Sequence, residues 1–212
     1  MVRTAVLVSG GGTNLQAIID ANLFGELKNC ELAAVISSNP EAYALTRAEL
    51  AKIPAYVIDI SIFPNRMSFC RALLDKLRDL DIELVVLAGF LYILDEPIVR
   101  HYENRIINIH PALIPAFSGA GCYGLRVHRY ALDYGVKISG ATAHFVTMEA
   151  DAGPIIVQRS VEVRAGDTPE ILQQRIMEEA EWRILPQAIA LYCAGRLRVE
   201  GRIVHISEEV EA

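Results

Sequence analysis

The sequence predicts a Rossmann-like α/β fold, with a mainly parallel twisted sheet, helices on both faces and antiparallel strands in the C-terminal part. Short, nearly continuous apolar runs alternate with segments of helical periodicity through residues 1–110, which is typical of a parallel sheet with helical crossovers. A glycine-rich turn joins the first apolar run to the first helical segment. Residues 137–146 then alternate between the two faces of a strand, which indicates a change of architecture in the second half.

Composition and charge limit the classes of function. The chain has 212 residues, of which 52% are hydrophobic and 22% charged, as in folded globular proteins. We predict a single domain, because no linker-like run divides the chain. The net charge of -6 argues against a nucleic acid partner, and no apolar run is long enough to span a membrane. The four cysteines are far apart and form no CxxC motif, so we predict no metal site and no disulfides, which fits a reducing cytoplasm.

The first predicted strand, residues 4–9, runs into a Ser-Gly-Gly-Gly-Thr-Asn turn at residues 9–14 and then into a helix. Glycines allow a ligand to approach the backbone closely, and the N-terminus of a helix offers free N–H groups, so a phosphate group is the expected ligand. The alternative is a tight turn in which Thr13 or Asn14 caps the helix. No Walker lysine follows, Leu15 stands where a dinucleotide motif has its third glycine, and the second strand, residues 32–36, ends without an acidic residue. A mononucleotide or sugar phosphate therefore fits better than NAD.

The alternation of helices and strands continues to residue 110. We predict helices at 41–51 and 64–80 and strands at 55–60 and 82–87, and the second helix carries Met67, Cys70, Leu73, Leu74, Leu77 and Leu80 on one face. Arg66 lies in the first turn of that helix, where a cation is mildly unfavourable, so it is either functional or a solvated surface arginine. The apolar turn at residues 88–94 is either plain core or the wall of a pocket for a flat ring.

The strand at residues 105–110 carries the strongest indication of chemistry. Pro111 cannot donate to a sheet, so the strand ends there, and Asn108 and His110 are its last polar side chains. Strand residues two apart point to the same side, and the carboxyl edge of an open α/β sheet borders the ligand crevice. We therefore predict a catalytic centre at Asn108 and His110.

The regular alternation stops after Pro111, and the long loop at residues 111–125 is expected to be functional. His144, in the strand at 137–146, is either a hydrogen-bonded structural group or a catalyst. Asp151 lies in the turn at 147–154, where an aspartate commonly serves the turn itself. We further predict helices at 125–134 and from Thr168-Pro169 onward, kinked or restarted at Pro186, a strand at 155–159 and a terminal hairpin of residues 197–199 and 203–206. Three helical glutamates, Glu178, Glu179 and Glu181, are most simply solvated charges.

Five motifs together resemble the phosphoribosylglycinamide formyltransferases, the folate-dependent glycinamide ribonucleotide transformylases of the formyltransferase family. The motifs are residues 9–18, 87–90 (Leu-Ala-Gly-Phe), 108–111 (Asn-Ile-His-Pro), 144–146 (His-Phe-Val) and 151–155 (Asp-Ala-Gly-Pro-Ile). The resemblance extends from Val2 to Arg198 in the same order and spacing. It implies a formyltransferase domain of residues 1–212, with a nucleotide-binding-like half at 1–110 and a folate-loop and C-terminal helix half at 111–212.

The resemblance also implies the function and its residues. The enzyme would transfer the formyl group of 10-formyltetrahydrofolate, its co-substrate, to the amine of 5'-phosphoribosylglycinamide in de novo purine biosynthesis, without a metal. Asn108, His110 and Asp151 would be catalytic, Gly12, Thr13 and Asn14 would bind the ribonucleotide phosphate, and Glu181 would touch the ribonucleotide. The folate site would comprise Arg66, Leu91, Tyr92, Ile93, Leu94 and Asn108. Tyr92 departs from the family, because many relatives carry an arginine there, and the loop at 116–125 is longer and richer in glycine.

Several alternatives use the same features differently. A 10-formyltetrahydrofolate hydrolase would use the same Asn, His and Asp with water as the acceptor, and commonly carries an additional N-terminal domain. A formyltransferase acting on initiator tRNA would be longer and more basic. An NAD-dependent dehydrogenase lacks support because the second strand has no acidic residue after it. A non-catalytic nucleotide-binding module would leave Asn108, His110 and Asp151 unexplained. The sequence does not predict an oligomeric state.

Overall fold

The computed structural model describes residues 1–208, which divide into two compact units, one of Met1–Ile107 and one that begins at Asn108. We call them the N-terminal unit and the C-terminal unit. The boundary between them falls within strand β5 (Ile106–His110). The expected single domain with halves at 1–110 and 111–212 stays a prediction.

The N-terminal unit is built on parallel strands, as the apolar runs predict. Its strands are β1 (Val2–Val8), β2 (Cys30–Ser37), β3 (Ala55–Val57) and β4 (Leu84–Leu87), arranged in the order β3-β2-β1-β4. The three neighbouring pairs in this order are parallel. The side chains of β4 and the last five of β1 are buried, because strands in the middle of such a sheet are covered on both faces.

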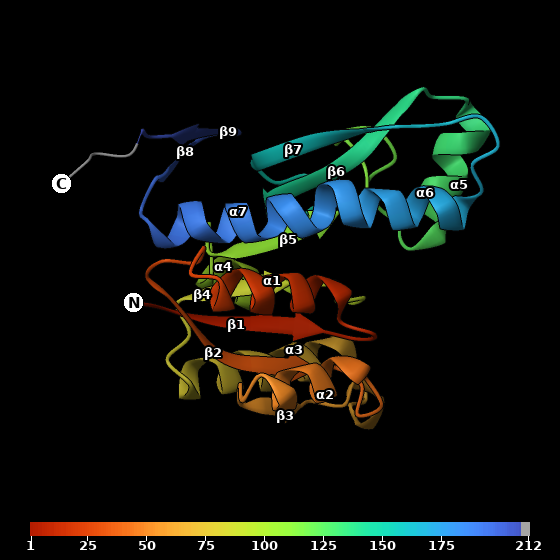
Figure 1. Ribbon diagram of the computed structural model, residues 1–212. Coiled ribbons are helices and arrows are strands. Elements are labelled where there is room, and N and C mark those ends of the chain that lie inside the picture. Colours follow the sequence, from red (N-terminus) through yellow and green to blue (C-terminus); the bar gives the residue numbers. More distant parts are fainter. Residues whose placement is uncertain (209–212) are drawn as a thin grey trace. The chain divides into compact units, whose positions relative to one another are not determined.

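The helices of the N-terminal unit form two groups. They are α1 (Thr13–Leu23), α2 (Tyr43–Leu50), α3 (Arg66–Asp79) and α4 (Glu96–His101), with a short 3-10 turn at Ile60–Ile62. From β1 the chain moves in one direction to β2 and β3, and then returns to β4 on the other side of β1. Right-handed crossovers therefore place α1 and α2 on one face and α3 and α4 on the other, and the contacts of α1 with α2 and of α3 with α4 agree (Figure 1). The carboxyl ends of β1 and β4 meet where the strand order reverses, which is where α/β proteins bind ligands.

Helix α3 confirms most of its predicted buried face. Asn65 caps the helix by accepting a hydrogen bond from the N–H of Ser68 at 2.9 Å. Leu73 and Leu77 are buried as predicted. The prediction was wrong for Met67, whose side chain is 67% exposed, and Phe69 is buried instead. Met67 lies in the first turn of the helix, and the buried positions begin only at Phe69.

The C-terminal unit has the antiparallel pairs that the alternating patterns predict. Its strands are β6 (Ile138–Phe145), β7 (Ile155–Glu162), β8 (Leu197–Glu200) and β9 (Ile203–Ile206), in the order β6-β7-β9-β8. The pairs β6–β7 and β8–β9 are antiparallel, whereas β7 and β9 are parallel. Parallel strands with crossover helices, followed by antiparallel pairs, confirm the predicted α/β fold class.

One long helical segment covers strands β6 and β7 (Figure 1). It consists of α6 (Pro169–Ile176), a π-helical turn at Met177–Glu181 and α7 (Trp182–Cys193), while α5 (Leu125–Tyr134) contacts α6. Thr168 caps α6 as predicted, accepting a hydrogen bond from the N–H of Ile171 at 3.3 Å. Pro186 neither ends nor restarts the helix, because the irregularity lies earlier, in the π-turn. That turn directly precedes the carbonyl of Trp182, which has no helical partner since Pro186 lacks an N–H.

Candidate active site

The glycine turn lies at the carboxyl end of β1, as the sequence predicts. Helix α1 begins at Thr13, and Gly12 precedes it in the left-handed region, with φ of 72°. A β-carbon on Gly12 would lie 2.7 Å from Cβ of Ala44, so glycine is required by space as well as by conformation. Within residues 1–208, the N–H groups of Gly11, Gly12 and Thr13 donate no hydrogen bond. They are available to an anion at the N-terminus of α1.

The glycine turn is tied to the segment that follows β4. The Oγ of Ser9 accepts a hydrogen bond from the N–H of Leu91 at 3.1 Å and lies 2.7 Å from the Oγ of Ser38. Both serines are buried. The loops after β1, β2 and β4 are therefore joined at the point where the strand order reverses.

An aromatic cluster connects this segment to helix α3, and it gives the reason why Tyr92 fits. The Tyr92 ring lies 5.8 Å from Phe90 and 6.0 Å from Phe69, and Phe69 in turn lies 5.8 Å from Phe63. Arg66 is the first residue of the helix that carries Phe69, and it is exposed. The tyrosine thus joins an apolar cluster that an arginine would not extend.

The predicted folate-binding residues of this segment differ in exposure. Leu91 is 68% exposed, Ile93 is 53% and Tyr92 is 37%, whereas Leu94 belongs to the core at 4%. Large apolar side chains exposed next to one another are typical of a binding surface. Arg66 and residues 91–94 lie in the N-terminal unit and Asn108 lies in the C-terminal unit. Their shared role in folate binding stays a prediction.

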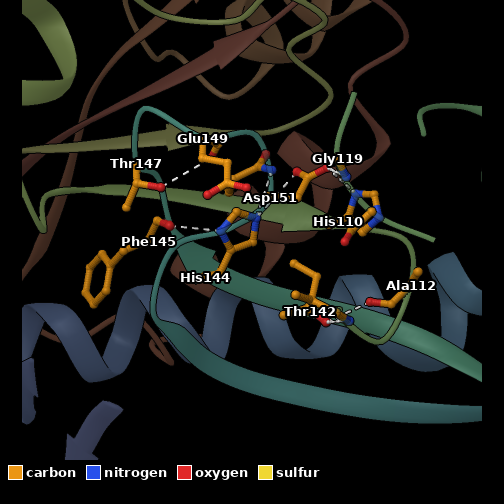
Figure 2. A network of polar contacts seen from close by, with 12 residues as sticks. His110, Ala112, Gly119, Thr142, His144, Phe145, Thr147, Glu149 and Asp151 are labelled. Carbon is orange, nitrogen blue, oxygen red and sulfur yellow. Dashed lines mark hydrogen bonds and ion pairs between the residues drawn. The ribbon is translucent and has the colours of Figure 1, made fainter. Parts of the chain in front are cut away.

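The C-terminal unit brings Asn108, His110 and Asp151 into one polar network, and Figure 2 shows His110, His144 and Asp151 from it. The Nδ1 of His110 lies 3.4 Å from Oδ2 of Asp151, and both side chains are largely buried. Asn108 joins through His144, since its Nδ2 lies 3.2 Å from Nε2 of His144, which is 3.8 Å from Oδ1 of Asp151. The network therefore links an amide, two imidazoles and a carboxylate at the end of β5.

His144 is a member of this network that sequence reasoning left open. Its Nδ1 lies 2.9 Å from the carbonyl oxygen of Phe145, which can only accept, so Nδ1 carries a proton. Burial lowers the pKa of His144, which favours the neutral ring, and Nε2 is then free to accept a hydrogen bond from Asn108. This contact fixes which way the Asn108 amide faces. In the sequence, the indication was the alternating pattern of the strand at 137–146, which places His144 on the same side as Thr142.

The ring of His110 faces an acceptor on each nitrogen. Its Nε2 lies 2.9 Å from the carbonyl oxygen of Phe117 and therefore donates to it, while Nδ1 faces the Asp151 carboxylate. Both facing atoms are oxygens that accept hydrogen bonds, so these two contacts orient the imidazole ring. The structure thus places His110 where it can act as a proton donor.

Strained backbone surrounds His110. Phe117 has φ of 50° and Asp151 has φ of 53°, both in the left-handed region that side chains other than glycine rarely adopt. Asp151 also accepts a hydrogen bond from the N–H of Gly119 at 3.0 Å, so it holds the 111–125 loop as well as the histidine (Figure 2). Such strain concentrates at functional sites, because surrounding contacts must maintain it.

Gly153 explains the glycine of the 151–155 motif. A β-carbon there would lie 1.8 Å from the carbonyl oxygen of Phe145, so any larger residue would displace the loop that carries Asp151. The pairing of β6 with β7 is irregular between Ala143 and His144. An irregularity of this kind turns a side chain toward a site, here His144.

A second hydrogen-bond network, centred on the buried Thr142, holds the start of the 111–125 loop. The hydroxyl of Thr142 donates to the carbonyl of Ala112 at 2.7 Å and accepts from the N–H of Ile114 at 3.1 Å. Gln158 donates to the carbonyl of Ile114 and to the Thr142 hydroxyl, both at 3.0 Å. These contacts fix the chain directly after His110.

His128, on α5, is fully buried. Among residues 1–208 neither of its ring nitrogens has a hydrogen-bond partner. Burial, the larger cause, and the electrostatic effect of nearby His110 together lower the pKa of His128 to about 4. His128 is therefore neutral at physiological pH.

Glu181 corrects one interpretation of the helical glutamates. Glu178 and Glu179 are exposed, as solvated charges should be, but Glu181 is only 6% exposed. It lies at the end of the π-turn, a feature that occurs frequently at functional sites. Its contact with a ribonucleotide stays a prediction.

Two features are absent from residues 1–208. No group of three or more His, Cys, Asp and Glu side chains there is arranged to hold a metal ion. No helix there is long and apolar enough to cross a membrane.

The chain is similar to known proteins over nearly its whole length. The family described as formyl transferase matches residues 2–189. Phosphoribosylglycinamide formyltransferase of Escherichia coli K12 is 40% identical over 198 residues, which cover 93% of this chain and 90% of that protein. The solved glycinamide ribonucleotide transformylase 1 of Symbiobacterium toebii is 46% identical with a TM-score of 0.92, over 98% of this chain and 95% of that one.

Longer proteins also match. The trifunctional purine biosynthetic protein adenosine-3 of Gallus gallus is 41% identical over 198 residues, and the chain spans only 19% of its length. A formyltetrahydrofolate deformylase from Pseudomonas syringae is 28% identical with a TM-score of 0.86, over 98% of this chain and 66% of that one.

Proposed function

The chain belongs to the formyl transferase family, and from this we propose that it transfers the formyl group of 10-formyltetrahydrofolate to the amine of 5'-phosphoribosylglycinamide. The product is the N-formyl ribonucleotide of de novo purine biosynthesis, formed in the cytoplasm. The observation that carries this proposal is the network of Asn108, His144, Asp151 and His110 at the end of β5. It provides donors and a proton carrier for acyl transfer without a covalent intermediate.

The donors act on the oxygen of the formyl group. The amine nitrogen attacks the formyl carbon, a C–N bond forms, and negative charge develops on that oxygen. Asn108 uses one amide N–H on His144, so its second N–H is available for the oxyanion. A single well-placed donor of this kind contributes about 3 kcal/mol to stabilising the transition state.

His110 is the second donor. In this structure its Nε2 bonds to the carbonyl oxygen of Phe117. The formyl oxygen replaces that carbonyl when substrate binds, because Nε2–H can serve only one strong acceptor at a time. The Asp151 carboxylate lies 3.4 Å from Nδ1 of His110 and orients the ring, so that Nε2 faces the acceptor.

The reaction also requires the transfer of a proton. The attacking amine loses a proton, and the folate nitrogen that leaves as the second C–N bond breaks must gain one. His110, or a water molecule beside it, carries this proton. No metal ion is required by these steps.

The substrates bind at the features that the sequence singled out. Gly12, Thr13 and Asn14 bind the phosphate of the ribonucleotide, which the unused N–H groups of the glycine turn support. Arg66, Leu91, Tyr92, Ile93, Leu94 and Asn108 bind the formyl-folate, which the exposed apolar side chains at 91 and 93 support. Glu181 contacts the ribonucleotide.

The second candidate is hydrolysis of 10-formyltetrahydrofolate, favoured by the structural similarity to a deformylase. The same network would then direct water to the formyl carbon. To separate the two, we would incubate the purified protein with 10-formyltetrahydrofolate and follow the absorbance of the folate with and without the ribonucleotide. Turnover that requires the ribonucleotide supports the transferase, and equal turnover without it contradicts our proposal.

A further inference from the structure

Arg47 reaches from α2 to the glycine turn. Its Nε donates to the carbonyl oxygen of Gly11 at 2.8 Å, and Nη1 donates to Oε1 of Gln16 at 2.9 Å. Its guanidinium carbon lies 5.1 Å from the centre of the Tyr43 ring, which is within the range of a cation–π contact. Arg47 therefore joins the turn, α1 and α2 through one side chain.

These contacts determine the direction of the turn's N–H groups. The carbonyl of Gly10 accepts from the N–H of Ala44 at 3.1 Å, and the carbonyl of Gly11 accepts from Arg47. In a trans peptide the C=O and the next N–H point in opposite directions. Since α2 holds both carbonyls, the N–H groups of Gly11 and Gly12 are directed away from α2, where an anion can accept from them.

The charge of Arg47 has no carboxylate partner. No Asp or Glu of residues 1–208 forms an ion pair with it. The guanidinium instead lies beside the N-terminus of α1, where the helix dipole is also positive. Two positive features side by side repel one another until an anion binds, so this arrangement favours a phosphate.

We propose that Arg47 is a positioning residue for the phosphate of the substrate. It holds the glycine turn in the binding conformation and adds positive potential at the phosphate position. The identity of the phosphate carrier rests on the proposed function. The predicted effect of Arg47 on the affinity for a phosphate group does not rest on the proposed function, because it follows from the glycine turn, the arginine and the N-terminus of α1.

The test uses three variants of the full chain. Arg47→Met removes charge and hydrogen bonds, and Arg47→Lys keeps the charge but cannot bond to Gly11 and Gln16 in the same way. Arg71→Met is the matched control, since Arg71 is exposed on α3 and its removal changes the net charge equally. We would measure kcat and the KM of each substrate, and the affinity for ribose 5-phosphate and inorganic phosphate by calorimetry without folate.

We expect Arg47→Met to raise the KM of the ribonucleotide about 10- to 50-fold, while kcat and the folate KM change by less than about threefold. The affinity of Arg47→Met for ribose 5-phosphate and for inorganic phosphate should fall by a similar factor. The ribonucleotide KM and the phosphate affinity of Arg47→Lys should lie between those of Arg47→Met and the wild type, and those of Arg71→Met should match the wild type. Unchanged phosphate affinity in Arg47→Met would overturn the proposal, as would an equal loss for both substrates.

Stability and activity are controlled separately. Circular dichroism melts of each variant identify general damage, and if Arg47→Met does not fold, Arg47→Lys alone must show the selective loss for the proposal to stand. If the wild type binds phosphate but transfers no formyl group, the proposed function fails while the phosphate measurements still decide the role of Arg47.

Discussion

Replacing Asp151 by asparagine tests the catalytic network most directly. The substitution keeps the shape of the side chain but removes the charge that lies 3.4 Å from Nδ1 of His110. At an effective dielectric constant of about 20, a carboxylate attracts an imidazolium formed at His110 during proton transfer, 3.4 Å away, by about 5 kcal/mol. Removing the charge also removes the cost of burying it, which offsets several kcal/mol of that attraction. The net effect of about 2 to 3 kcal/mol predicts a kcat that is roughly 30- to 150-fold lower.

The assay is the initial rate of folate release at saturating concentrations of both substrates, measured from pH 6 to 9. Asp133→Asn is the matched control, because Asp133 is exposed on α5 and the change of charge is the same. We expect Asp133→Asn to turn over normally and to unfold at the same urea concentration as the wild type, and a cooperative urea unfolding curve for Asp151→Asn shows that this variant is folded. A kcat for Asp151→Asn within about threefold of the wild type would refute the role given to the carboxylate.

Three further predictions concern His144, His128 and Asp167. His144→Phe leaves the Asn108 amide without its acceptor, so kcat should fall about 5- to 30-fold. His144→Gln can accept through its amide oxygen and should recover part of this loss. Equal rates in the two variants would contradict the orienting role of His144. The pKa of His128 is lowered to about 4 in the folded protein, against 6.5 when unfolded, so the unfolded chain binds the extra proton. The free energy of unfolding is therefore at its full value above pH 6.5 and falls by about 3 kcal/mol as the pH drops to 4. Urea unfolding at pH 7.5, 5.5 and 4.5 should show a smaller drop for His128→Phe than for the wild type, and identical drops would contradict the assignment. Asp167, whose pKa is lowered by its hydrogen bonds with Arg175, contributes stability at neutral pH that is lost as the pH falls from 3.8 through the lowered pKa of the folded state. Asp167→Asn should therefore lower the free energy of unfolding in urea at pH 7, and the difference from the wild type should shrink below pH 3.8; a difference that does not change with pH would contradict this assignment.

The local elements of this protein could be predicted from the sequence. Helix α5 has the predicted bounds, and most other helices and strands differ from prediction only at their ends. The glycine turn before α1 and the proline after His110 mark points where local chemistry alone changes the backbone. These features depend on near neighbours in the chain, which a sequence displays directly.

The partners of each functional side chain could not be predicted in the same way. The sequence placed Asn108 and His110 at the end of a strand, but the contact of Asn108 with His144 depends on an irregularity in the pairing of β6 with β7. The bond from His110 to Phe117 depends on the path of a long loop. Neither the pairing irregularity nor the path of the loop produces a repeating pattern in the sequence from which it could be predicted.

The sequence by itself determined the fold class, the glycine turn and the positions of the polar side chains at the end of β5. Only the tertiary structure decided that Glu181 is buried, that Arg47 holds the glycine turn and that His144 fixes the Asn108 amide. The physical reason is the range of the interactions. Helical and strand periodicity arise from residues a few positions apart, whereas burial and hydrogen bonding join residues about 30 or more positions apart and exist only once the chain has folded.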